Sequence, residues 1–269
     1  METGNVDNFK HLIKVVNTVW AIEDAKFTQL MKLFDQKLNG GDISTLLGAE
    51  GWEVFKLSPE VASMTVDGVL VPTTMGAQPI CGMVPTFAME AKIRELEDMG
   101  FKTLILELDT PGGVVTGIPE LADTIKDSSM EVIVFSKEMC CSAGMWIASA
   151  ADKFFCTKSA RVGSIGVRLA VTKKSQDDTY ETYNFTGGKE KLYGDPAIPM
   201  TEEEKEYFEY SVKATYDWFT FTVAENRGVE ESKVRETEAR TYMGKDAPDF
   251  LVDDIVTIND FRSFILENL

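Results

Sequence analysis

The sequence is poor in the residues on which several common enzyme classes depend. It contains a single histidine, His11, among 269 residues, so a serine or cysteine nucleophile that needs a histidine base would have to recruit it from the N-terminal segment. The four cysteines lack the CxxC spacing of zinc sites, and reduced thiols in a cytosolic protein are the expected state. No apolar run approaches the roughly 20 residues that cross a bilayer, and no secretory signal is visible.

The sequence also lacks an excess of basic residues. Its formal net charge is -17, with 27 Lys and Arg against 44 Asp and Glu. We therefore expect no binding to nucleic acid through the phosphates and no attraction to anionic membranes. Since 44% of the residues are hydrophobic, the composition suits a soluble protein of one large domain, with or without extensions.

The stretch from Met130 to Asp152 carries the strongest signal for function. An apolar run at 132–135 predicts a buried strand, small residues follow at 140–144, and an alanine-rich segment at 145–151 predicts a helix. Ser142 therefore lies where a helix begins, with free N–H groups close by. We interpret Ser142 as a candidate nucleophile, and the alternative is an ordinary helix-capping serine.

The order of the expected elements predicts an α/β fold with a parallel sheet and crossover helices. The expected elements are strands at 61–72, 103–108 and 132–135, with helices at 86–99 and after Ser142. Functional sites in such sheets lie at the carboxyl ends of the strands. Pro111-Gly112-Gly113 and Ser142 both follow strands, so we expect them to share one edge of the sheet.

Two regions flank this core. Apolar residues at helical spacing from Phe9 to Trp20 and from Phe27 to Leu38 predict two amphipathic helices. We expect them to form an N-terminal arm, residues 1–57, before a second domain at 58–269; the arm could serve packing or docking of a partner. A capping box at Thr201 predicts a long helix rich in aromatic residues, which suits core packing or a subunit interface.

Three groups near these strand ends suit acyl transfer. Gly112 and Gly113 can expose backbone N–H groups to an oxyanion, although a tight turn is the simpler interpretation. The N–H of Ala143 could be a second donor. A lysine is the usual substitute when no histidine can act as the base. Lys189 or Lys191, on a glycine-rich loop, is a candidate for this role. The alternative is that each lysine is a solvated surface charge.

At these residues the chain resembles a known family. The segments DTPGGVVTG, CCSAGMWIASAADKFF and RVGSIGV are similar to three motif blocks of the signal peptide peptidase A family of serine peptidases, which share the fold group of Clp peptidase and the crotonases. The resemblance covers roughly residues 61–255. The arm, with Trp20-Ala21-Ile22, looks like the phage branch of that family, the prohead proteases.

The resemblance implies a Ser-Lys dyad in a Clp/crotonase-like parallel-sheet core. Ser142 matches the nucleophile, and the motif offset from Gly188 selects Lys191 as the base. Ser164 matches a serine that helps to orient the lysine amine, and Gly113, Gly112 and Ala143 would supply the oxyanion hole. The chain departs from the family pattern at Ala143, where a glycine is common, and at Phe250, the first position of a Gly-Leu-Val-Asp motif.

We therefore expect a serine endopeptidase that cleaves scaffold or capsid proteins during phage head maturation. Its expected location is the host cytoplasm or the interior of the prohead, as a homo-oligomer with no metal, cofactor or membrane anchor. One alternative is a cellular protein-quality-control peptidase of the same chemistry. Another is a non-catalytic assembly factor with this fold, and a crotonase acting on acyl-CoA is a more distant one.

Overall fold

The computed structural model describes residues 19–23, 52–73, 82–171, 186–187, 189–195 and 198–267. The two predicted N-terminal helices, apart from Trp20, lie outside the described residues.

Six strands form the central sheet, in the order β13-β10-β8-β6-β3-β2. They are β2 (Trp52–Lys56), β3 (Val61–Asp67), β6 (Thr103–Asp109), β8 (Glu131–Ser136), β10 (Lys153–Cys156) and β13 (Asp254–Ile255). All neighbours run parallel except β2, which is antiparallel to β3 at the edge. The predicted α/β class is confirmed, and this parallel core is the arrangement expected of the Clp/crotonase-like group.

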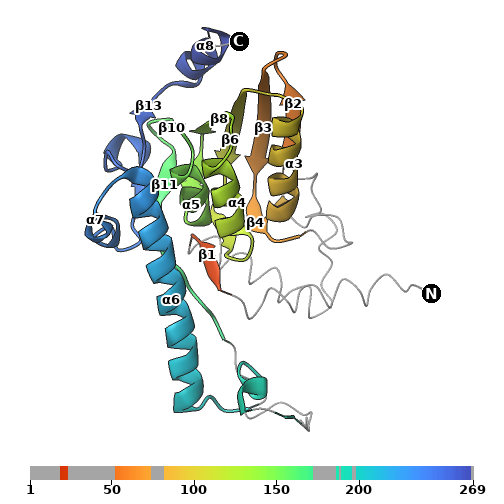
Figure 1. Cartoon of the computed structure of the whole chain (residues 1–269). Coiled ribbons are helices and arrows are strands. Elements are labelled where there is room, and N and C mark those ends of the chain that lie inside the picture. The colour runs from red at the N-terminus through yellow and green to blue at the C-terminus, as the bar shows by residue number, and fades with distance from the viewer. Residues whose placement is uncertain are drawn as a thin grey trace, which may run out of the picture.

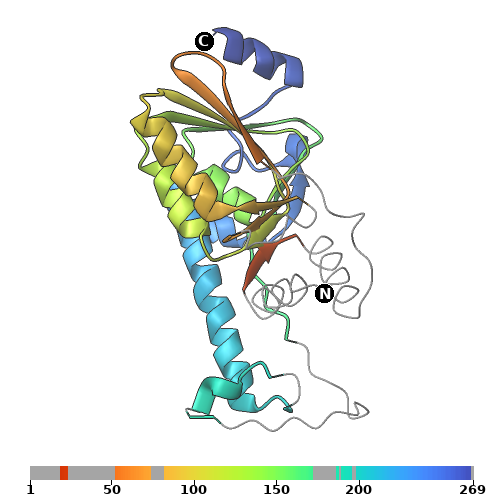
Figure 2. The same ribbon diagram turned by 90° about the vertical axis from the view of Figure 1, so that its right-hand side faces the viewer.

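Helices cover both faces of this sheet (Figure 1; Figure 2). They are α3 (Thr86–Asp98), α4 (Ile118–Lys126), α5 (Ala143–Ser149), α6 (Glu202–Arg227), α7 (Glu231–Arg235) and α8 (Ile258–Glu267), with short 3-10 turns η2 (Lys189–Leu192) and η3 (Gly244–Asp246). Leu104 and Leu106 of β6 belong to the core shared with α3, α4 and α5. Ile105, which alternates with them, belongs to a second core with Phe261 of α8. Because both faces are buried, the inner strands read as continuous apolar runs.

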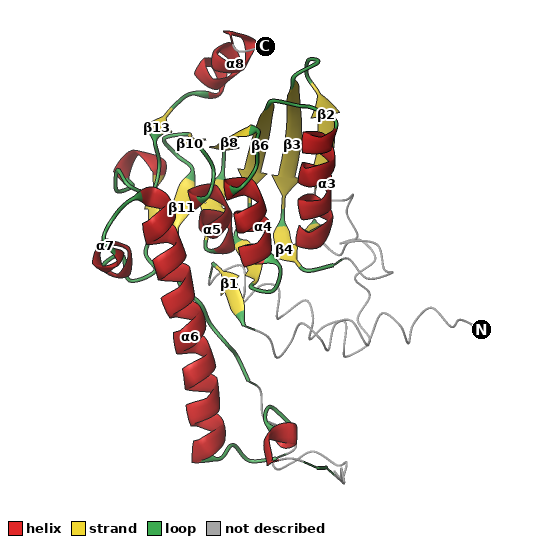
Figure 3. Cartoon of the chain, in the orientation of Figure 1, coloured by secondary structure: helices red, strands yellow, loops and turns green. Residues whose placement is uncertain are grey.

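Short strands continue the central strands beyond a break and form two further small sheets. They are β1 (Trp20–Ile22), β4 (Val69–Val71), β5 (Met83–Pro85), β7 (Gly112–Val114), β9 (Met139–Cys141), β11 (Arg161–Gly163) and β12 (Thr241–Met243), in the orders β1-β7-β4-β5 and β12-β11-β9. Figure 3 shows β4 following β3 past such a break, at Gly68 with φ 144°. The carboxyl ends of the central strands therefore lead into this second layer.

The long helix α6 connects the core to the lower part of the molecule. Thr201 and Glu204 form the predicted capping box, which is confirmed. Near the other end of α6, Trp146 of α5 stacks on Phe219, with ring centroids 4.4 Å apart. The amino-terminal half of α6 extends beyond the packed core (Figure 1).

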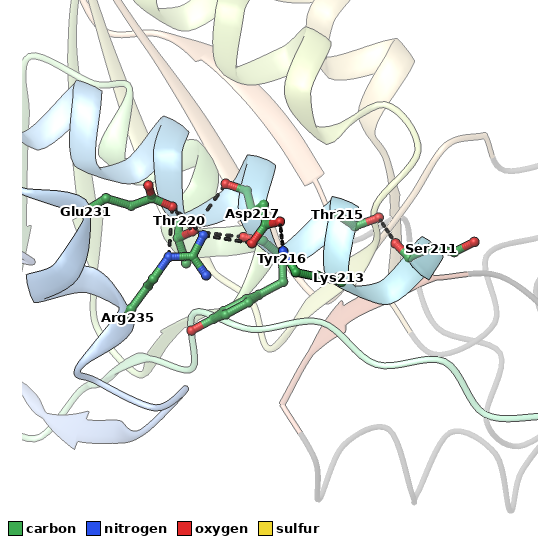
Figure 4. Close-up of polar contacts among 8 residues, drawn as sticks. All are labelled: Ser211, Lys213, Thr215, Tyr216, Asp217, Thr220, Glu231 and Arg235. Atoms are coloured by element: carbon green, nitrogen blue, oxygen red, sulfur yellow. Dashed lines mark hydrogen bonds and ion pairs between the residues drawn. The ribbon is translucent and has the colours of Figure 1, made fainter. Parts of the chain in front are cut away.

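A polar network fastens α7 to α6 (Figure 4). The Arg235 guanidinium donates to Asp217 of α6 at 2.8 Å and to Glu231 of α7 at 2.6 Å. Lys213 also contacts Asp217 at 2.5 Å, and Thr220 donates to Glu231 at 2.6 Å. Hydrogen bonds from Lys213 and Arg235 lower the pKa of Asp217, and those from Thr220 and Arg235 lower the pKa of Glu231.

Two expectations need correction. Trp20 was expected to end an amphipathic helix, but it begins strand β1, where pairing with β7 buries it completely. The proposed boundary at residues 57 and 58 falls between β2 and β3, which pair in one sheet, so residues 52–56 join the central sheet.

Candidate active site around Ser142

Ser142 occupies the junction between β9 and α5 in a conformation that capping does not explain. Its φ of 54° and ψ of -116° are rare for a residue with a side chain, and its hydroxyl makes no capping hydrogen bond to the helix. The capping interpretation is therefore wrong for this serine. Its Oγ instead donates to the carbonyl of Gly166 at 3.2 Å, and its N–H donates to the carbonyl of Gly163 at 2.8 Å. Strain of this kind, worth about 1 to 3 kcal/mol, gathers at functional sites.

The glycine turn after β6 lies directly against Ser142. A Cβ built on Gly112 would lie 3.0 Å from Ser142 Cβ and would overlap the carbonyl oxygen of Ala21. The φ of Gly112, +101°, is also one that L side chains rarely adopt. A Cβ on Gly113 would overlap the carbonyl oxygen of Leu70. The prediction that Pro111-Gly112-Gly113 and Ser142 share one edge of the sheet is confirmed.

The three predicted oxyanion donors differ in their surroundings. The Gly112 N–H donates to Thr110 Oγ1 at 3.0 Å, so it is used within the turn. Ala143 is the first residue of α5, and its N–H therefore has no acceptor inside the helix. Gly113 lies in β7, beside β1. Gly113 and Ala143 are therefore better placed than Gly112 for an oxyanion role, which stays a prediction.

Asp109, at the end of β6, fixes the turn that leads to Ser142, a role that sequence analysis missed. Its Oδ1 accepts hydrogen bonds from Ser136 Oγ at 2.9 Å and from the N–H groups of Lys137, Glu138 and Met139 at 2.8 to 3.1 Å. This carboxylate thus fixes the turn between β8 and β9, which leads to Ser142. A carboxylate directly after a buried strand and before a glycine turn is the signal that could have identified it.

The segment after β11 lies along the other side of Ser142. Gly163 and Gly166 supply the two carbonyls that bind the serine, and Ser164 lies between them. Ser164 is half-buried, has φ 56°, and donates its N–H to Arg240 at 2.9 Å. Ser164 therefore lies between two residues that contact Ser142, and its action on a lysine amine stays a prediction.

Lys191 lies on η2, away from Ser142. It is exposed, which differs from the burial expected of a base, and η2 connects to the start of α6, where the Gly194 N–H donates to Glu204 at 2.7 Å. Ser142 lies instead near the part of α6 at Trp218, since Trp146 of α5 packs there. At 1.5 Å per residue, these two points on α6 are roughly 20 Å apart.

Figure 1 shows the same separation, with the teal turn that contains Lys191 beside the lower end of α6. One chain therefore does not bring Lys191 to its own Ser142 in this structure. Gly188 and the side chain of Lys189 lie outside the described residues.

The neighbouring thiols are unsuited to act as nucleophiles. Cys140 and Cys141 are buried, and burial raises the pKa of Cys140 well above its usual value and that of Cys141 to about 12. Burial also raises the pKa of Cys156 to about 12. These thiols are protonated at neutral pH, so Ser142 is the nucleophile that the junction offers.

An open groove of about 670 Å³ begins beside the nucleophile. Gly166, whose carbonyl accepts the Ser142 hydroxyl, lines one end of it, and Val167 and Val171 continue that wall. Phe208 and Tyr216 of α6 are among the residues that line the groove.

Among the described residues, no group of three or more Cys, His, Asp or Glu side chains could hold a metal ion.

The arrangement suits a nucleophilic hydrolase: a strained serine at a helix start lies against a glycine turn. A family comparison agrees, because the model of peptidase family S49 matches residues 124–265. The match covers more than half of the chain, and the chain belongs to peptidase family S49. The predicted class, a serine peptidase of the signal peptide peptidase A type, is confirmed at the level of the family.

Phage proteins are among the relatives. The chain is 31% identical over 207 residues to capsid assembly protease C of Escherichia phage lambda, covering 74% of this chain and 47% of that protein. It is 25% identical over 214 residues to head-tail preconnector protein GP5 of Enterobacteria phage P21, covering 77% and 43%. It is 29% identical over 164 residues to the chloroplastic serine protease SPPA of Arabidopsis thaliana, covering 58% and 24%. The chain thus spans less than half of each of these proteins.

No helix among the described residues is both long and apolar enough to span a bilayer.

Proposed function

We propose that the chain is a serine endopeptidase that uses Ser142 as nucleophile and Lys191 as general base. The observation that carries this is the geometry of Ser142, whose strained backbone releases its hydroxyl from capping and holds it against the Gly112 turn. A helix-capping serine would have neither the strain nor the glycine partner. Membership of family S49 supports the same chemistry.

In the proposed reaction, Ser142 Oγ attacks the carbonyl carbon of the scissile peptide while neutral Lys191 takes the hydroxyl proton. The lysine then returns this proton to the leaving amine, and water hydrolyses the resulting ester. The N–H groups of Gly113 and Ala143 hold the oxyanion, which is the main source of rate enhancement. Ser164 orients the lysine amine.

Because Lys191 is exposed and roughly 20 Å of α6 separates its turn from the region of Ser142, we propose that it serves the Ser142 of a second copy in a homo-oligomer. The surface of α6 supports association. Its exposed aromatic side chains are Tyr207, Tyr210, Trp218 and Phe221, between 44% and 73% accessible. Exposed aromatic side chains of this kind are typical of interfaces. Docking against another copy would also shield Lys191 from solvent.

For the substrate, we propose scaffold or capsid proteins cleaved during phage head maturation, in the host cytoplasm or inside the prohead. The names of the lambda and P21 proteins support this choice. The similarity to a chloroplastic serine protease keeps a cellular quality-control role as the second candidate.

Complementation tests the dyad and its assembly together. Ser142→Ala and Lys191→Ala chains should each be inactive on a casein or scaffold substrate. Co-expressed with different affinity tags and purified through both, they should regain part of the activity, since one mixed site holds both groups. Lys189→Ala serves as the matched control and should remain active alone. Full activity of Lys191→Ala alone would refute the base, and an inactive mixed assembly would refute its supply by a second copy.

A further inference from the structure

The strand β1 lies beside Ser142, against the glycine turn. Its antiparallel partner on one side is β7, the strand of the catalytic glycines. On the other side it pairs with Arg168, through N–H to carbonyl bonds of 2.9 and 2.8 Å exchanged by Trp20 and Arg168. Residues 19–23 are thus hydrogen-bonded on both edges, as an extended peptide would be when it binds to a protease by strand addition.

The register places one peptide carbonyl of this strand at the predicted oxyanion site. The Val115 N–H donates to the carbonyl of Val19 at 3.2 Å, and the Glu23 N–H donates to the carbonyl of Pro111 at 2.8 Å. Hydrogen-bonded pairs alternate along antiparallel strands. The pair midway between these two, Ala21 and Gly113, is therefore also a hydrogen-bonding pair, which directs the Gly113 N–H at the Ala21 carbonyl.

Ser142 is close to the same carbonyl. A Cβ built on Gly112 would overlap the Ala21 carbonyl oxygen and would also lie 3.0 Å from Ser142 Cβ. The Ala21 carbonyl and the Ser142 side chain therefore lie on either side of the same small space. Ser142 itself is completely buried, with an exposed fraction of 0%. The strand therefore presents a peptide bond to the nucleophile and leaves no open path for another peptide at that position.

The side chains of β1 show which residues the position accepts. Trp20 and Ile22 are buried in a small apolar cluster with Val71 and Val114, while Ala21 faces the opposite way into the main core. Glu23 forms an ion pair with Arg161 at 3.1 Å. The strand position beside Ser142 therefore accepts a small residue opposite Gly113, with a large apolar residue on each side of it.

We propose that Trp20–Ile22 occupies the substrate-strand position of Ser142, so that the chain blocks its own active site until this strand leaves. The proposal rests on the proposed function for the identity of the site. It also defines the substrate class: an extended protein segment with a small residue opposite Gly113, flanked by bulky apolar residues. A substrate must displace the strand, and a locked strand must prevent binding.

A reversible lock tests this. Trp20 lies directly opposite Val114, one step along the strands from the Ala21–Gly113 pair. The two residues form a non-hydrogen-bonded pair, in which opposed Cα atoms are about 4.5 Å apart. A disulfide can form across that distance. The double variant Trp20→Cys, Val114→Cys is oxidised to lock the strand and reduced to free it. The matched control is Lys56→Cys, Ala62→Cys, a non-hydrogen-bonded pair between β2 and β3, far along the central sheet from Ser142.

The first readout is labelling of Ser142 by a fluorophosphonate probe. Oxidation of the Trp20→Cys, Val114→Cys protein should slow labelling by about ten-fold or more, because only the opened fraction reacts, and reduction should restore it. The control pair should label equally in both states. Equal labelling of the locked and the reduced double variant would overturn the proposal and leave the peptidase assignment intact.

The second readout does not need catalysis. In a Ser142→Ala background, a fluorescent peptide with the sequence of residues 16–26 should bind the reduced double variant and not the oxidised one. The same peptide with Ala21→Phe should bind neither, since the position opposite Gly113 is closed to a large side chain. Equal binding to both states, or equal binding of the two peptides, would overturn the proposal. Binding that follows the lock, without probe labelling in either state, would instead refute Ser142 as nucleophile.

Discussion

A methyl group added to Gly112 should inactivate the site while leaving most of the fold in place. Two costs combine in Gly112→Ala. The residue has φ +101°, and holding a side chain in such a conformation costs about 1 to 3 kcal/mol. The new Cβ would also overlap the Ala21 carbonyl oxygen and lie 3.0 Å from Ser142 Cβ. Overpacking of this kind costs about a further 1 to 3 kcal/mol.

Gly100→Ala separates the two costs. Gly100 has a similar φ of +87°, but a Cβ there would meet nothing within 4 Å. Its substitution should therefore show the conformational cost alone, about 1 to 3 kcal/mol. The difference in free energy of unfolding between the two variants, measured by urea denaturation, then reports the contact with Ser142 and β1.

Activity should respond more steeply than stability. The methyl group that Gly112→Ala adds would push the Ser142 side chain from its position, and a displacement near 1 Å can cost about 100-fold in rate. We expect probe labelling and peptide turnover of Gly112→Ala to fall by at least that factor, and those of Gly100→Ala to stay within about two-fold of the unmodified chain. If Gly112→Ala matches Gly100→Ala in both stability and labelling rate, the close approach of the glycine turn to the nucleophile is not needed.

The other predictions concern the dyad and the α6–α7 network. Ser142→Ala should abolish peptide turnover and cost only about 1 kcal/mol in urea denaturation, because it removes one hydrogen bond to Gly166; undiminished turnover would rule it out as nucleophile. Lys191→Ala should lose peptide turnover while Lys189→Ala keeps it, and unchanged turnover of Lys191→Ala would exclude this base. The network formed by Asp217 and Glu231 should weaken in acid. Both carboxylates have a lowered pKa in the folded state, so they stabilise the fold at neutral pH. This contribution is lost as the pH falls below their ordinary pKa values of 3.8 and 4.5. The free energy of unfolding of Arg235→Gln should accordingly approach that of the unmodified chain at low pH, and a constant difference would contradict this.

The sequence was sufficient to predict the features that depend on local pattern. The apolar runs of β6 and β8 and the capping box of α6 follow from hydrophobic content and local hydrogen bonding, and each element lies within a few residues of its expected place. The shared edge of the glycine turn and Ser142 followed from one rule of parallel sheets, that strand ends meet.

The features that the sequence did not reveal depend on long-range partners. Trp20 fits a helical pattern with Phe9 and Val16, and only its pairing with β7 and Arg168 makes it a strand. The role of Asp109 depends on N–H groups almost thirty residues further along the chain. The distance of Lys191 from Ser142 depends on the length of α6, which no motif encodes.

The attachment of β1 to the chain has a consequence for competition at the position it occupies beside Ser142. An internal strand acts as a ligand whose effective concentration is set by its tether, of order millimolar for short flexible links and lower for longer ones. The segment between residues 23 and 52 links β1 to the central sheet. A dilute peptide of equal intrinsic affinity would rarely replace the strand. A substrate packed with the enzyme at millimolar density would compete on equal terms, so confinement alone could start proteolysis.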